Sequence, residues 1–152
     1  MTDLKGIKGF KVQTLSTDSV ASQALGGTWA SSTSTNTARN KLGSAGVATA
    51  SLIFGGSPGS PPVLAVTESW DGSSWTEVND LSSAVDQQGG AGTYTLALSF
   101  GGGPGPGPVT AATEEWTLSN LVGAWTTSGS LNTARRVLGG AGIYTAALAF
   151  GG

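Results

Sequence analysis

Three stretches of the chain repeat one apolar strand that ends in Phe-Gly-Gly. They read SAGVATASLIFGG (44–56), GAGTYTLALSFGG (90–102) and GAGIYTAALAFGG (140–152). Steps of 46 and 50 residues separate these copies, and the same steps relate Trp29, Trp75 and Trp125. A period of this length is typical of repeat architectures, in which each unit buries its apolar faces only by stacking on its neighbours. The chain is therefore predicted to build its core from about three copies of one unit.

The unequal steps locate a hairpin inside the unit. The short Trp70–Trp75 spacing grows to the longer Trp116–Trp125 spacing, while the distances on either side stay constant. An insertion confined to one spot marks a loop, here the turn between two short strands. Each period then holds four expected strands: TESW, SWTEV, a Gly-rich strand and the apolar strand. That is the content of one β-propeller blade, with the apolar strand expected at the inner position.

The amino-acid composition excludes several kinds of site and partner. Cys and His are both absent from the sequence, which excludes disulfides, thiolate or imidazole metal sites, and Ser/His or Cys/His nucleophile pairs. The net charge is −2 and no basic stripe exists, so nucleic acid is not an expected partner. No window reaches the ~18 apolar residues of a membrane span. We therefore expect no cofactor, no metal, no nucleic acid and no membrane insertion.

Glu68 and Glu114 are the obvious pair of carboxylates. A glycosidase needs two carboxylates facing each other across a cleft. These two instead occupy the same place in successive units, in VTESW (66–70) and ATEEW (112–116), which favours a structural role. No catalytic residue is predicted, and the chain is not expected to be an enzyme.

Three arginines and the tryptophans are the other residues of interest. Arg39 and Arg135 close the motif Asn-Thr-Ala-Arg, and Arg136 follows directly. Arg39 and Arg135 are expected to bond loop carbonyls or a repeat acid such as Glu68 or Glu114; contact with an anionic sugar is the alternative. Trp116 lies beside the longer hairpin loop, so it is the tryptophan best placed to be exposed and stack on a carbohydrate. The residues offered for glycan or partner contact are therefore Trp116, Arg135 and Arg136.

The constant spacing of the aromatic residues predicts the core. Side chains that keep one register to the apolar strand should fill the space between successive units. The positions expected to be buried in this way are Trp29, Trp75, Trp125, Phe54, Phe100 and Phe150.

The motifs TESWDGSSWTEVNDL, GAGTYTLALSFGG and LNTARRVLGGAG resemble the kelch-like repeats of marine bacteriophage virion and tail-fibre proteins. The resemblance covers residues 28–152, and KVQTLSTD (11–18) also resembles the segment that precedes those repeats. It implies kelch-like β-propeller blades and a structural or receptor-binding role in a phage particle. It supplies no catalytic residues.

The expected architecture is all-β, with about three four-stranded antiparallel sheets in an incomplete ring. An N-terminal attachment arm (1–27) precedes the kelch-like repeats (28–152), which divide into 28–56, 57–102 and 103–152. Propellers have about four to eight blades, so this chain does not close a ring alone. Several chains would pool their blades, the chain would continue past Gly152, or the blades would stack on other proteins.

The expected function is that of a non-enzymatic structural protein of the virion. A tail or tail-fibre component that contacts the host surface is favoured, and a capsid decoration or cement protein without a receptor role is the alternative. The resemblance implies a homo-oligomer, with a trimer favoured and two chains also giving a plausible blade count. The other expected partners are virion proteins, reached through the arm, and a host-surface glycan. Residues 143–150 are expected to be covered by another polypeptide.

Overall fold

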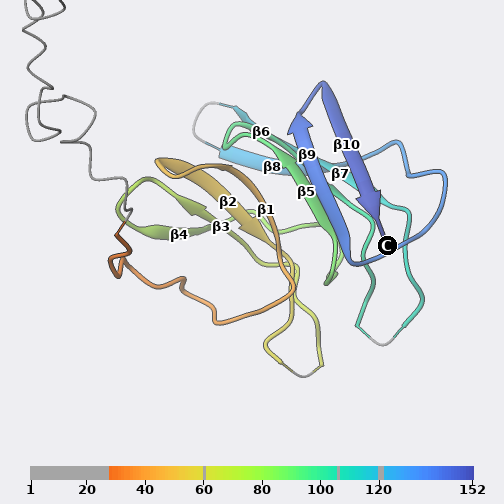
Figure 1. Cartoon of the computed structure of the whole chain (residues 1–152), viewed down its shortest axis with the longest axis horizontal. Helices are drawn as coiled ribbons and strands as arrows, with labels where there is room; N and C mark the ends of the chain where they lie inside the picture. The colour runs from red at the N-terminus through yellow and green to blue at the C-terminus, as the bar shows by residue number, and fades with distance from the viewer. Residues whose placement is uncertain (1–27, 60, 106, 120–121) are drawn as a thin grey trace, which may run out of the picture. The chain divides into compact units, whose positions relative to one another are not determined.

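The computed structural model describes residues 28–59, 61–105, 107–119 and 122–152 (Figure 1). The compact unit Ser32–Gly152 holds all of the described strands. The proposed attachment arm, residues 1–27, lies outside the described residues. Within the described part of the chain the protein is all-β, as expected, and its strands form three antiparallel sheets.

Two of the sheets have four strands each, hydrogen-bonded in chain order. The first sheet consists of β1 (Gly43–Val47), β2 (Ala50–Phe54), β3 (Thr67–Trp70) and β4 (Trp75–Val78). The second consists of β5 (Gly89–Gly92), β6 (Leu96–Phe100), β7 (Thr113–Ser119) and β8 (Val122–Ser128). The third has two strands in the described residues, β9 (Leu138–Ile143) and β10 (Ala146–Gly151).

Each sheet runs across the end of a sequence copy. The apolar strand β2 pairs with β3 of the following copy, with Phe54 opposite Thr67, and β6 pairs with β7 in the same way, with Phe100 opposite Thr113. Both glycines of every Phe-Gly-Gly motif have positive φ, between 63° and 100°, where residues with a side chain are strained. The motif therefore directs the chain out of the apolar strand and back as the next strand of the same sheet.

The Gly-rich strands of the three sheets lie next to one another. β1, β5 and β9 lie next to one another, and β5 and β9 are seen side by side in Figure 1. A Cβ on Gly90 would lie 2.4 Å from the Ser44 carbonyl oxygen, and one on Gly140 would lie 2.3 Å from the Gly90 carbonyl oxygen. Only glycine permits this approach, and the apolar strands β2 and β6 lie second in their sheets, paired on both sides.

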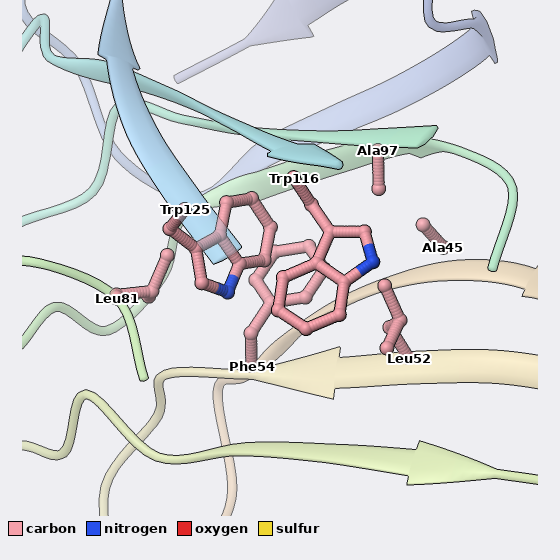
Figure 2. Close-up of a cluster of buried hydrophobic side chains, with 7 residues drawn as sticks. All are labelled: Ala45, Leu52, Phe54, Leu81, Ala97, Trp116 and Trp125. Carbon is pink, nitrogen blue, oxygen red and sulfur yellow. The ribbon is translucent and has the colours of Figure 1, made fainter. Parts of the chain in front are cut away.

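The main core fills the space between the first two sheets. Figure 2 shows Leu52 and Phe54 of β2 facing the indole rings of Trp116 and Trp125. The Phe54 and Trp125 rings meet edge to face with centroids 4.9 Å apart, and the two indoles are 5.5 Å apart. The Trp125 Nε1–H donates to Thr67 Oγ1 at 3.0 Å, which joins β8 of one sheet to β3 of the other.

The expected core positions divide according to how complete their sheet is. Phe54, Phe100 and Trp125 are buried, and Trp75 is half-buried. Phe150 is 52% exposed and Trp29 is fully exposed, so their expected burial is corrected. In the described residues Phe150 lies on a sheet without third and fourth strands, and Trp29 belongs to neither the sheets nor their compact unit.

Candidate functional site

The Glu68 carboxylate is completely buried and is bonded on several sides. It accepts hydrogen bonds from the backbone N–H groups of Asn36 at 2.7 Å and Thr37 at 3.2 Å. Arg39 Nη2 lies 3.0 Å from Glu68 Oε1, and both side chains are 0% exposed. Glu68 therefore connects the loop that precedes its sheet to the third strand of that sheet. Of the partners expected for Arg39, the structure shows the repeat acid.

The pairing of Arg39 and Glu68 balances an unfavourable burial. Burial lowers the pKa of the Arg39 guanidinium below its usual value, and the negative charge of Glu68 opposes that shift. A buried ion pair contributes little net stability, but the loss of one partner leaves an uncompensated charge in the interior. Both groups are thus engaged in holding the fold and are closed to solvent.

Glu114 plays the same part in the second sheet. Its carboxylate accepts the backbone N–H of Ser82 at 2.9 Å, and Ser82 occupies the place of Asn36 in its own copy. Val85 stands where the first copy has Arg39, so this copy lacks the ion pair. Glu68 and Glu114 therefore each bond the loop that precedes their own sheet, at equivalent places of the repeat. This arrangement favours a structural role over a catalytic pair of carboxylates.

The third copy repeats the loop without a carboxylate. Asn132–Arg135 has the same sequence as residues 36–39. Arg135 Nη1 donates to the Gly151 carbonyl at 3.2 Å, and Arg135 Nε is buried with no hydrogen-bond partner in the described residues. Arg135 therefore has the place of Arg39, but in the described part of the chain no carboxylate pairs with it.

Trp116 is not available as a stacking platform in this structure. Its ring is 1% exposed, and its Nε1–H donates to the Tyr94 carbonyl at 3.0 Å. The indole lies over Gly123, where an added Cβ would fall inside the ring's contact distance. The longer hairpin expected to expose Trp116 instead provides the glycine surface against which it packs.

A cavity of about 630 Å³ lies between the two Gly/Pro-rich loops, and Arg136 lines it. Arg136 Nη1 donates to the Gly105 carbonyl at 3.0 Å, and Lys41 Nζ lies 3.7 Å from Asp86 Oδ2. Asp86 Oδ1 is buried without a hydrogen-bond partner in the described residues. An acceptor beside two cations and proline rings is suited to hydroxyl-bearing ligands.

The sequence analysis identified Arg136 but missed Asp86, because neither other copy has an acid at the place of Asp86.

A second polar contact was also missed from the sequence. Tyr144 Oη donates to Glu115 Oε2 at 2.6 Å, and the Ser128 hydroxyl donates to Glu115 Oε1. These bonds lower the pKa of Glu115 and raise the pKa of Tyr144, because both favour the carboxylate and the protonated phenol. The contact joins β7 to the β9–β10 turn and thereby links the second and third sheets.

No family model matches the chain, and no curated protein matches it. Across the described residues, no group of three or more Asp, Glu, Cys or His side chains is placed to hold a metal ion. The described part of the chain also contains no helix long and apolar enough to cross a membrane.

Proposed function

We propose that the chain is a non-enzymatic structural protein of a bacteriophage particle, in the tail or a tail fibre. The observation that carries the proposal is the use of the repeat acids. Glu68 and Glu114 are buried and bond loops of their own sheets, so the most prominent carboxylates hold a scaffold together. The resemblance to kelch-like virion repeats supports the placement in a particle.

The sheets are proposed to be blades of a kelch-like propeller. Each complete sheet is a meander, and the first strands of the three sheets lie side by side, as inner strands of neighbouring blades do. The chain is proposed to assemble as a homo-oligomer, because the outer edge of β10 is open in the described residues and can pair with another chain. The N-terminal arm is proposed to attach it to other virion proteins.

The outward role is proposed to be contact with a host-surface glycan. The supporting feature is the cavity that holds the unpartnered Asp86 carboxylate oxygen together with Lys41 and Arg136. Carboxylate and guanidinium groups bind sugar hydroxyls well, and proline rings offer apolar surface to a sugar face.

Imaging of intact particles tests the proposal. Gold-labelled antibody against the chain should mark the tail. Label over the capsid shell would support the alternative, a decoration protein without a receptor role. Absence from purified particles, with the protein present in infected cells, would contradict both.

Binding of host polysaccharide tests the glycan role separately. The wild-type protein should retain polysaccharide in a pull-down and leave it uncleaved. Asp86→Asn should weaken retention, and Asp71→Asn, in an exposed hairpin turn, is the matched control. Retention unchanged by Asp86→Asn, or glycan cleavage lost on Glu68→Gln, would count against the proposal.

A further inference from the structure

The outer edge of β10 is uncovered in the described part of the chain. β10 pairs there with β9 alone, whereas β2 and β6 each pair with a following strand as well. Leu148 is 64% exposed, but Leu52, at the same place in the first sheet, is 0% exposed. An uncovered strand beside an apolar face is a site for strand addition.

The complete sheets define what the missing strand must offer. The residue opposite the Phe-Gly-Gly phenylalanine is threonine in both sheets, Thr67 and Thr113. The next residue is the glutamate that bonds the preceding loop. A strand added to β10 should therefore place threonine opposite Phe150 and a carboxylate opposite Ala149.

Charge complementarity points to the same carboxylate. Residues 132–135 repeat the loop that surrounds Glu68, and Arg135, unlike Arg39, forms no ion pair in the described residues. In the first sheet that loop provides two backbone N–H donors and Arg39 to one carboxylate. The loop before the third sheet therefore has the same hydrogen-bond donors, but the carboxylate that would accept from them is not among the described residues.

The chain contains one further segment of this kind. TDSVASQALGGTW (17–29) aligns with TEEWTLSNLVGAW (113–125) without a gap. Thr17, Asp18, Gly27 and Trp29 fall on Thr113, Glu114, Gly123 and Trp125. Both segments are followed after the same spacing by Asn-Thr-Ala-Arg. Four of the thirteen positions are identical, and the departures include an aspartate one methylene shorter than glutamate and Val20 at the place of Trp116.

We propose that residues 17–29 of a second copy add the third and fourth strands to β10, with the Asp18 carboxylate bonded to Arg135. In the order of the repeats, this segment belongs to the sheet before the first one, so it completes the third sheet of a neighbour. Two copies then contribute six sheets, within the range of about four to eight that propellers use, whereas three copies would give nine. The inference does not depend on the role in a phage particle.

A second surface is consistent with a head-to-tail pair. The Trp70 and Trp75 rings are 5.2 Å apart and half-buried, in the arrangement that Trp116 and Trp125 adopt over Phe54. In the pair, Trp70 and Trp75 of one copy would cover the exposed Phe150 of the other. Each contact occurs twice, which closes the assembly.

Disulfide trapping tests the proposed register, and the natural chain has no cysteine to interfere. In the first sheet, Leu52 lies opposite Ser69, and the N–H of Gly55 donates to the Val66 carbonyl. Hydrogen-bonded and non-hydrogen-bonded pairs alternate along an antiparallel ladder, so Leu52–Ser69 is a non-hydrogen-bonded pair. The equivalent pair is Leu148 with Ser19. Chains with Leu148→Cys mixed with chains with Ser19→Cys should oxidise to a covalent dimer on a non-reducing gel. Ala147→Cys with Ser19→Cys is the control and should not cross-link, because neighbouring residues point to opposite faces.

The same experiment decides between one copy and two. The double variant Ser19→Cys, Leu148→Cys should run as a dimer; an internally bridged monomer would overturn the assignment to a second copy. Failure of the mixed chains to cross-link would overturn the inference, and so would cross-linking in the control pair that equals that of the test pair.

Two charge variants test the ion pair without cysteine chemistry. The wild-type chain of 15.0 kDa should scatter light as a species of about 30 kDa. Arg135→Gln and Asp18→Asn should each raise the dimer dissociation constant at least about tenfold, and the double variant should cost little more than either alone. A wild-type monomer or trimer, or fully additive effects, would contradict the proposal.

Discussion

At the residue scale, the fold depends on carboxylates used as backbone acceptors. Glu68 is the clearest case, since it is enclosed by Arg39 and two N–H groups. The sequence offered that pairing as one alternative, because Arg39 recurs as Arg135 and Glu68 recurs as Glu114. The Glu115–Tyr144 contact could not be predicted, because the preceding unit has Tyr94 at the place of Tyr144 but Ser69 at the place of Glu115. A contact between two residues that occur together in one unit cannot be predicted from the periodicity of the sequence.

Replacement of Glu68 should expose the cost of a buried, unpaired arginine. Glu68→Gln keeps the size of the side chain but removes the charge that balances Arg39, so the free energy of unfolding should fall by about 3–5 kcal/mol. Urea denaturation followed by tryptophan fluorescence measures it. Glu77→Gln, at the exposed residue directly opposite on β4, is the control and should change stability by less than about 0.5 kcal/mol. Equal effects of both variants would refute the role of the buried pair.

Asp71 should titrate below the usual range of aspartate. Its carboxylate accepts backbone and hydroxyl hydrogen bonds from Ser73 and Ser74, which lower its pKa. Because the pKa is lower in the folded chain than in the unfolded one, this contribution to stability is present above pH ~4 and is lost as the pH falls through the folded pKa. An NMR titration of the Asp71 carboxyl carbon should show the depressed midpoint. A midpoint at or above the usual value would contradict the turn geometry.

At the scale of elements, the sequence predicted four strands per period, and each of the two complete sheets has four strands. The apolar strand β6 lies second in its sheet and is paired on both sides. The Gly-rich strands lie at the edge of their sheets, where β1, β5 and β9 approach too closely for side chains. The hydrophobic pattern predicts which strands are buried. The order of the strands in the sheet depends instead on how closely the Gly-rich strands can approach one another.

The close approach of the Gly-rich strands should be sensitive to a single methyl group. Gly90→Ala would place a Cβ against the Ser44 carbonyl of the neighbouring sheet, so the free energy of unfolding should fall by about 1–3 kcal/mol. Gly129→Ala, where nothing lies within 4 Å of the added carbon, is the matched control. Thermal unfolding of both variants decides the matter, and a Gly90→Ala protein as stable as the control would rule out this packing.

At the scale of the whole molecule, the repeat explains both the complete sheets and the incomplete one. The first two sheets bury their apolar strands between neighbours, while Leu148 and Phe150 of the third stay exposed in the described residues. Fold class and repeat number could be predicted from periodicity. The cavity at Asp86 could not, because two loops that are distant in sequence form it.

Amide exchange on the third sheet measures most directly whether another polypeptide completes it. The N–H of Gly55 points to β3 and that of Gly101 to β7, so by alternation the Ala147 and Ala149 N–H groups point to the open side of β10. In the assembled protein, NMR-detected exchange at these two amides should be as slow as at Ala97 and Ser99 of β6. It should become fast in Arg135→Gln. Fast exchange at Ala147 and Ala149 in the wild-type protein at every concentration would contradict the account.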